Sequence, residues 1–339
     1  MNDKKITIND VARMSGVSKR TISRVINNSS KVGKATRERI QKIIDELNYS
    51  PNPQARGLAA RRSYLLGLIY DNPEALHISD VQRGALSVCR ELGYELVVHP
   101  CENLDEVLIN EAVHFARRSK LDGVIILPPI SENNDLAGAL GKAGVNYVRL
   151  ASIALDSANH VVISNDRSAA AAMAEYLFGL GHRQIGYITG PKGLESTRER
   201  LEGFYDALES YGCKLNDDMI AEGAYTFESG IECTHTLLAQ NTPPTAIFAS
   251  NDEMAVGAIN AARDMGLKVP DDLSIAGFDD SILASRIIPS LTTIRRPVRE
   301  MARLAANKLI ASINDNTDAA NTVIIVEPQL VVRDSTQSI

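Results

Sequence analysis

Features that define several large classes of protein are missing from this sequence of 339 residues. It has no Trp, and its four Cys stand far apart, without the paired spacing of a metal site. No secretory leader and no apolar run long enough to span a membrane are recognisable. We therefore expect a reduced, cytoplasmic protein that makes no contact with a membrane.

The signatures of common enzyme sites are missing as well. Gly138, Gly141 and Gly144 have GxxGxxG spacing, but they fall in a helical pattern rather than after a strand, so they do not form a dinucleotide-binding turn. The segment GPKGLEST lacks the Lys and Ser or Thr that end a phosphate-binding loop, and there is no GxSxG motif. We expect no catalytic residues, no metal and no cofactor.

Charge is divided unevenly along the chain. Residues 1–62 carry 14 Lys and Arg against 5 Asp and Glu, a net charge of +9. The other 277 residues carry 22 against 37, a net charge of −15. Basic segments gain affinity for duplex DNA by displacing counterions from its phosphates, whereas an acidic body is repelled. The amino-terminal part is therefore expected to bind nucleic acid, and the remainder to do something else.

The basic segment TINDVARMSGVSKRTISRVIN has the pattern of two short helices around a turn. Thr7 and Asp10 have capping-box spacing, and Gly16 suits the left-handed conformation of a tight turn. Ser18 can cap a second helix, expected from about Lys19 to Asn27, whose outer face is basic. This arrangement predicts a helix-turn-helix.

A third helix completes the expected all-α headpiece, residues 1–49. Thr36 is expected to cap it, and it should continue to about Leu47. Its Ile40, Ile43 and Ile44 recur at helical spacing and would close a small core.

The segments VSKRTISRVIN, ATRERI and LNYSPNPQARGLAARR, in this order, resemble the LacI/GalR family of bacterial transcription repressors. The resemblance implies that the start of the second helix enters the major groove of double-stranded operator DNA, where Lys19, Arg20 and Arg24 would face base edges. Polar neighbours would hold phosphates. The nominated DNA-binding residues are Ser18, Lys19, Arg20, Thr21, Ser23, Arg24, Asn27, Thr36, Ala55 and Leu58.

Residues 50–62 are expected to form a hinge. Pro51 and Pro53 end the preceding helix, and QARGLAARR could form two helical turns that are too short to be stable alone. The resemblance implies a helix that orders only on operator DNA and inserts Leu58 into the minor groove. A flexible linker, in which Leu58 has no special role, is the alternative.

From Tyr64 onward, apolar runs such as DGVIILPP and TAIFASN alternate with helical stretches. This pattern predicts parallel sheets covered by helices on both faces, and about 275 residues exceed what one core usually holds. The segment resembles the periplasmic-binding-protein-like α/β fold of two doubly wound lobes. The expected core spans residues 63–339, with one lobe of about 64–161 and 293–321, and a second of about 162–292 and 322–339.

Polar residues at strand ends would line a cleft between the lobes, because ligands of such sheets sit beyond the carboxyl ends of the strands. Two positions depart from the family pattern, since Ala151 stands where Asp is frequent and Arg296 where Gln is common. The additional cation could favour an acidic or phosphorylated effector, or it could pair with Asp71 or Asp279. The nominated effector-binding residues are Asp71, His77, Ile78, Arg200, Asn251, Asp279 and Arg296.

Together these features predict a cytoplasmic, nucleoid-associated repressor that leaves a palindromic operator when a sugar or sugar phosphate binds. One helix-turn-helix reads too few bases for genomic specificity, which favours a homodimer, and no Leu heptads follow the last expected strand. A co-repressor mechanism, in which the ligand tightens operator binding, is the first alternative. A sugar-modifying enzyme with a basic tail is the second, and the missing catalytic motifs disfavour it.

Overall fold

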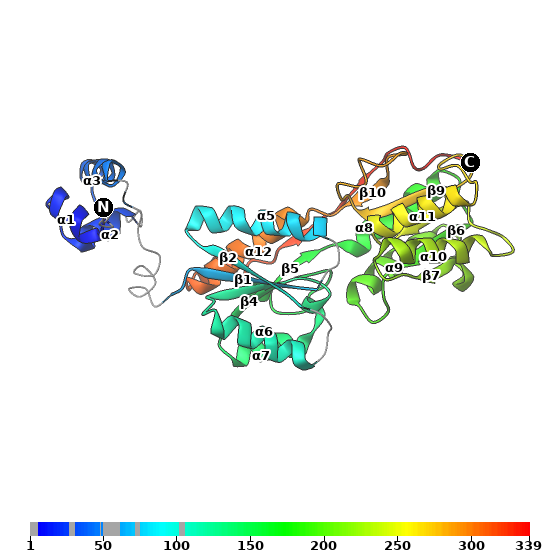
Figure 1. Cartoon of the computed structure of the whole chain (residues 1–339). Coiled ribbons are helices and arrows are strands. Elements are labelled where there is room, and N and C mark those ends of the chain that lie inside the picture. Colours follow the sequence, from blue (N-terminus) through cyan, green and yellow to red (C-terminus); the bar gives the residue numbers. More distant parts are fainter. Residues whose placement is uncertain (1–5, 27–30, 48, 50–61, 72–74, 102–105) are drawn as a thin grey trace. The chain divides into compact units, whose positions relative to one another are not determined.

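The computed structural model describes residues 6–26, 31–47, 49, 62–71, 75–101 and 106–339. The chain divides into two compact units, Met1–Tyr64 and Leu65–Ile339 (Figure 1). The first unit contains α1 (Ile8–Ser15), α2 (Lys19–Ile26) and α3 (Lys34–Glu46). One apolar cluster joins these helices; its buried members are Val11, Ile22, Val25, Ile40 and Ile44.

Local chemistry explains where these helices begin and end. The Asp10 carboxylate accepts hydrogen bonds from the backbone N–H and the hydroxyl of Thr7, at 3.0 and 2.7 Å. Gly16 ends α1 with a φ of 67°, a conformation that suits glycine, and Ser18 Oγ accepts from the N–H of Thr21 at 3.2 Å. These contacts confirm the predicted helix-turn-helix.

The start of α3 differs from the expectation. The helix begins at Lys34, two residues before Thr36, because the carbonyl of Gly33 already accepts the first helical hydrogen bond, from Arg37 N–H at 3.0 Å. Thr36 therefore lies in the first turn of α3 and does not cap it. Asn27 and residues 50–61, which include Ala55 and Leu58, lie outside the described residues.

The first lobe of the second unit is built on a parallel sheet with strand order β11-β5-β4-β3-β1-β2. In Figure 1, α5 and α12 cover one face of this sheet, and α6 and α7 cover the other. Its strands are β1 (Leu65–Tyr70), β2 (Glu95–Pro100), β3 (Gly123–Ile126), β4 (Asn146–Ala151), β5 (Val161–Ser164) and β11 (Ile325–Val326). Its helices are α5 (Ala75–Leu92), α6 (Glu106–Arg118), α7 (Asn134–Lys142), α12 (Val298–Ile313) and α13 (Thr317–Ala320), with short 3-10 turns η1 (Ile130–Glu132) and η2 (Ala158–His160).

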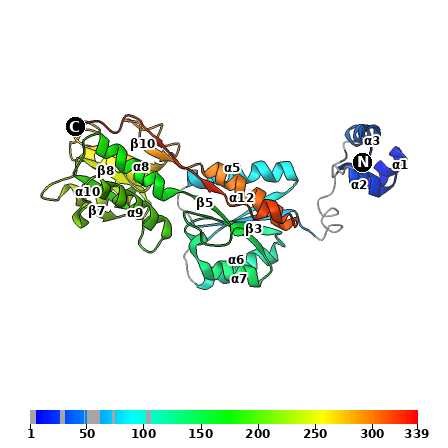
Figure 2. The same cartoon turned by 180° about the vertical axis from the view of Figure 1, so that it is seen from behind.

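The second lobe has a sheet with strand order β12-β10-β9-β8-β6-β7, in which β12 is antiparallel to β10 and the other pairs are parallel. Figure 2 shows both lobes from behind. The strands are β6 (Ile185–Thr189), β7 (Ile220–Glu222), β8 (Ala246–Ala249), β9 (Ser274–Asp279), β10 (Thr292–Arg295) and β12 (Gln329–Val331). The helices are α8 (Asp166–Gly179), α9 (Glu195–Ser210), α10 (Phe227–Leu238) and α11 (Asp252–Asp264), with the 3-10 turn η3 (Asp217–Met219).

The chain passes between the two sheets after β5, after β10 and after β11. Each passage lies a few residues beyond the predicted crossover near 162, 293 or 322. Strand pairing is the reason, because β11 continues the first sheet beside β5, with Ile325 opposite Ile163, and β10 stays beside β9 as far as Arg295.

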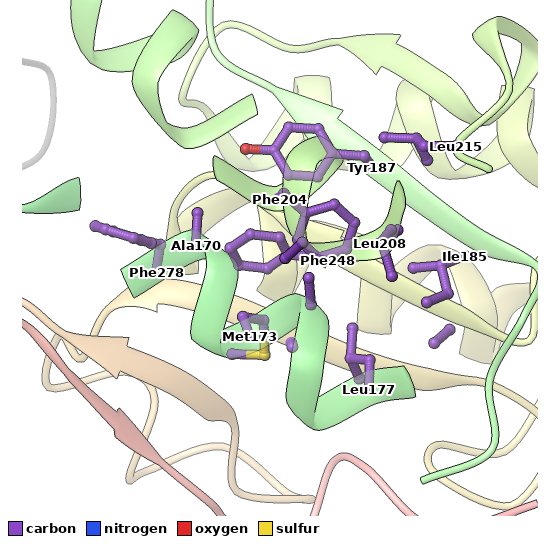
Figure 3. Close-up of a cluster of buried hydrophobic side chains, with 14 of the residues drawn as sticks. Ala170, Met173, Leu177, Ile185, Tyr187, Phe204, Leu208, Leu215, Phe248 and Phe278 are labelled. Carbon is purple, nitrogen blue, oxygen red and sulfur yellow. The ribbon is translucent and has the colours of Figure 1, made fainter. Parts of the chain in front are cut away.

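Aromatic packing in the second lobe fixes the position of α9. The rings of Tyr187, Phe204 and Phe248 are fully buried, with centroids 5.0 to 5.2 Å apart (Figure 3). Gly203 allows α9 to lie against α8, because a Cβ there would be 2.2 Å from the carbonyl oxygen of Arg167. This packing holds the first turns of α9 at the side of the lobe that faces the cleft.

Candidate functional site

A cavity of about 200 Å³ lies between the two lobes. Asp71, which follows β1, and the Pro128–Pro129 pair, which follows β3, contribute the wall of the first lobe. The wall of the second lobe includes Arg200 from α9 and Asp279 at the end of β9. Strand ends converge here because the carboxyl ends of parallel strands share one edge of a sheet.

The structure brings together most of the residues that the sequence nominated for a ligand. Ile78 is the exception, since it is 5% exposed and is not part of the cavity wall. Successive residues of a helix point about 100° apart, so when His77 of α5 faces the cavity, Ile78 turns into the lobe. The nominated residues that line the cavity are Asp71, His77, Arg200, Asn251, Asp279 and Arg296.

Asp166, which sequence reasoning did not nominate, joins the two cationic residues of the cavity. It is the first residue of α8 and is fully buried. Its carboxylate accepts from Arg200 Nε at 3.0 Å and lies 3.5 Å from Arg296 Nε. The hydroxyls of Ser152 and Ser164 donate to it at 2.9 and 2.5 Å. A signal was present, because HVVISND ends in the same Ser-Asn-Asp as the strand end FASND.

This network fixes the charge state of Asp166. Burial by itself raises the pKa of the Asp166 carboxyl, but the two guanidinium groups and the donated hydrogen bonds outweigh burial, so its pKa is lowered. The ion-pair partner of Arg296 is Asp166, which the sequence did not offer, and the charge of Arg296 also acts on Asp279. Arg200 is held further by Ser250, whose carbonyl accepts from it at 2.6 Å, and its guanidinium carbon lies 3.9 Å from the ring centroid of Phe278.

Within the described part of the chain, Asp279 contributes a buried polar atom without a partner to the cavity. Its Oδ1 is buried and has no hydrogen-bond partner among the described residues, and its φ of 111° is unusual for a residue with a side chain. Burial raises the pKa of Asp279, although Arg200 and Arg296 act in the opposite direction. Strained backbone and an unpartnered polar atom are typical of a site that a ligand completes.

Two further residues of the wall, His77 and Asn251, differ in charge and in the hydrogen bonds that they already make. His77 is neutral near pH 7, because burial together with Arg296 and Arg200 lowers its pKa to about 3. Asn251 is already engaged: its Oδ1 accepts from Met254 N–H at 2.9 Å, and its Nδ2 donates to the Tyr225 carbonyl at 3.0 Å. Next to it, Asp252 is buried beside Asp279, and burial followed by that charge raises its pKa to about 8.

Helix α2 carries Lys19 and Arg20 in its first turn and Arg24 in its last turn. Ser18, Lys19 and Arg20 are exposed, whereas Thr21, Ser23, Arg24 and Thr36 are half-buried. None of the three cations Lys19, Arg20 and Arg24 forms an ion pair with another described residue. A helix with free cations at its amino-terminal end can approach the bases of a major groove.

Other kinds of site are not supported by the part of the chain that the structure describes. It holds no group of His, Cys, Asp and Glu that could bind a metal. The four Cys are buried, and burial raises the pKa of each thiol, which lowers its reactivity. Among the same residues, no helix has the length and apolarity needed to cross a membrane.

Known proteins combine the same two parts. Residues 7–52 match the family model of bacterial regulatory proteins of the lacI family, and residues 174–336 match that of the periplasmic binding protein-like domain. The probable HTH-type transcriptional repressor ExuR of Bacillus subtilis is 33% identical over 97% of this chain and 98% of its own. The HTH-type transcriptional repressor PurR of Pasteurella multocida is 34% identical over 98% of this chain and 99% of its own.

A solved structure of a repressor is similar to this chain over its whole length. The lac repressor dimer bound to operator and the anti-inducer ONPF has a TM-score of 0.77 and 30% identity, covering 99% of this chain and 100% of that one. A helix-turn-helix joined to a two-lobed core with a ligand cleft defines a DNA-binding transcription regulator and not an enzyme. The chain belongs to the LacI family of bacterial regulatory proteins.

Proposed function

We propose that this chain represses transcription at an operator and releases it when a small polyhydroxylated effector binds between the lobes. The observation that carries this proposal is Asp279, whose buried Oδ1 lacks a partner in a cavity walled by both lobes. Carboxylate, guanidinium and imidazole groups bind vicinal hydroxyls, and the Pro128–Pro129 pair offers an apolar surface to a sugar ring.

The cavity favours a ligand the size of a sugar or sugar phosphate. Its volume of about 200 Å³ lies below the roughly 300 Å³ at which most drug-sized pockets begin. Arg200 and Arg296 pair with Asp166, and their charges also act on Asp279, so a ligand would meet groups of both signs, which suits hydroxyls as well as a phosphate. The alternative is a co-repressor mechanism, in which the ligand tightens operator binding.

On the DNA side, Lys19, Arg20 and Arg24 would read base edges from α2. Ser18, Thr21, Ser23, Asn27 and Thr36 would hold phosphates. In the hinge, Leu58 would enter the minor groove, and Ala55 is a further proposed DNA contact. A palindromic operator needs two such modules, so we propose a homodimer that acts in the cytoplasm at the nucleoid. The operator-bound dimer of the lac repressor supports this arrangement.

Effector binding would act by changing how the lobes close on each other. In a dimer, closure alters the separation of the two hinges, which start near Arg62, so that they no longer pair on DNA. To shift the protein from 99% competent to 1%, the effector must bind the released form more tightly by about 5.5 kcal/mol.

The effector can be found by a thermal-shift screen of sugars, sugar acids and sugar phosphates, and the operator by selection from random DNA. A ligand at 100 times its dissociation constant stabilises the native protein by about 2.7 kcal/mol. In Asp279→Ala, we expect the affinity for the compound found in this screen to fall on the order of 10- to 100-fold, and operator binding without effector to stay near wild type.

Arg200→Ala should likewise lower the affinity for the compound and leave operator binding unchanged, provided that circular dichroism shows the variant to be folded. Asp264→Ala, which removes an exposed carboxylate of the same lobe, is the control and should change neither affinity. Loss of operator binding by folded Asp279→Ala, or a wild-type response to the compound, would refute the site assignment. Operator binding only in the presence of the compound would replace release by co-repression.

A further inference from the structure

A carboxylate of the first lobe bonds directly to the backbone of a helix in the second lobe. The two oxygens of Glu132, the last residue of η1, accept from the N–H groups of Glu195 and Ser196 at 2.6 and 3.0 Å. These two residues form the beginning of α9. The pair of bonds joins residues more than 60 positions apart and spans the two lobes.

The helix that receives this carboxylate has no cap of its own. Leu194 occupies the cap position of α9, and its side chain has no hydrogen-bonding group. The carboxylate of Glu195 cannot substitute, because it pairs with Arg198. The first N–H groups of a helix need an acceptor and carry the positive end of the helix dipole. Glu132 therefore supplies from the other lobe what the local sequence omits.

Glu132 is held in place by the first lobe. Ser131 next to it is 1% exposed, donates to the Leu150 carbonyl at 2.6 Å, and accepts from Arg149 Nε at 2.6 Å. The buried Arg149 guanidinium also donates to Asn134 Oδ1 at 2.9 Å, so it contacts residues on both sides of Glu132. The backbone of this turn is therefore already ordered, so binding of Glu132 to α9 costs only the entropy of its side chain.

The first two turns of α9 also form part of the ligand cavity. Leu194, Ser196 and Arg200 all line it. Any movement that separates the lobes must withdraw Glu132 from α9 and expose the N–H groups of Glu195 and Ser196. The contact is therefore available only when the lobes are closed.

We propose that Glu132 is an interlobe latch, a positioning residue that favours lobe closure by capping α9 across the cleft. Its regulatory consequence rests on the proposed function, because closure matters only if the cleft binds an effector. The latch itself is tested without any ligand, so a wrong effector assignment would leave its test unaffected.

The first measurement is hydrogen exchange of the ligand-free full chain. Glu132→Gln keeps the size of the side chain but removes its charge and one of its two acceptors. We expect the amides at the beginning of α9 to exchange roughly tenfold faster or more, since hydrogen bonds to charged groups are strong. The matched control is Asp135→Asn, which removes an exposed carboxylate three residues away on α7 and should leave these amides unchanged.

Small-angle X-ray scattering of the same proteins separates a latch from a simple helix cap. A latch predicts a larger radius of gyration for Glu132→Gln than for the wild type and for Asp135→Asn. Unchanged amide exchange in Glu132→Gln would overturn the proposal, because the bonds would not be formed in solution. Faster exchange with an unchanged radius of gyration would also overturn it, because Glu132 would then cap α9 without holding the lobes closed.

Discussion

Substitution of Asp166 by Asn is the sharpest test of the charge network in the cleft. Asp166 is the carboxylate that Arg200 and Arg296 share, and the exposed fractions of the three side chains are 0, 5 and 6%. Asn has nearly the same shape, but it offers one acceptor oxygen and turns a donor N–H₂ toward groups that are donors themselves. Two buried cations would lose the carboxylate that both of them contact.

Breaking a buried ion pair by removing one partner typically costs about 3 to 5 kcal/mol, because the remaining charge is left unsolvated. A domain has a total stability of about 5 to 15 kcal/mol, so the loss would be a large fraction. We expect Asp166→Asn to lower the free energy of unfolding by about 3 to 5 kcal/mol at pH 7. Since the chain has no Trp, urea unfolding is best followed by far-ultraviolet circular dichroism.

The pH dependence of this loss has a definite sign. The pKa of Asp166 is lowered in the folded state, so its contribution is present above its unfolded value of about 3.9 and is lost as the pH falls through the folded value. The difference in unfolding free energy between wild type and Asp166→Asn should therefore be constant from pH 7 to about 5 and shrink at more acid pH.

A double variant and a control complete this test. Asp166→Asn with Arg296→Gln removes one of the stranded cations and should recover more than about 1 kcal/mol of the loss. Asp264→Asn on the exposed surface should stay within about 0.5 kcal/mol of wild type. A loss below about 1 kcal/mol in Asp166→Asn would refute the reasoning, because it would mean that water reaches the two guanidinium groups.

The remaining predictions concern DNA reading, packing and titration. Arg20→Ala should weaken selected operator DNA by about 1 to 3 kcal/mol and relax the preference at one position per half-site; equal weakening on random DNA would contradict base reading. Gly203→Ala should lower thermal stability by about 1 to 3 kcal/mol, because its Cβ would meet the Arg167 carbonyl at 2.2 Å, whereas Gly138→Ala, with open space around it, should raise stability by up to about 1 kcal/mol. The pKa of Asp252 is raised to about 8, so between about pH 4 and 8 the folded protein holds a proton that the unfolded chain has lost. The stability of the wild type should therefore fall as the pH rises through this range. Asp252→Asn should flatten this slope, and an unchanged slope would exclude Asp252 as its source.

Short-range chemistry explains the parts of the fold that could be read from the sequence. The pairing of Thr7 with Asp10, the turn at Gly16 and the cap at Ser18 each involve residues within four positions of one another, so the sequence contains both partners. The alternation of apolar strands and helices predicted parallel sheets covered on both faces, and the length of about 275 residues together with the family resemblance predicted two lobes. Convergence of Arg200, Asn251 and Asp279 at one cavity followed from a general rule about parallel strand ends.

The partners of the buried charges depended on tertiary structure. From the sequence, Arg296 could pair with any of several carboxylates. It pairs with Asp166 because the fold brings β5, α8 and the segment after β10 together. Nothing in the residues around Glu132 indicates that it caps a helix more than 60 positions away. Such contacts join elements that are far apart in the sequence. Electrostatic partners are selected by distance in space and by exclusion of water, neither of which is encoded in local spacing.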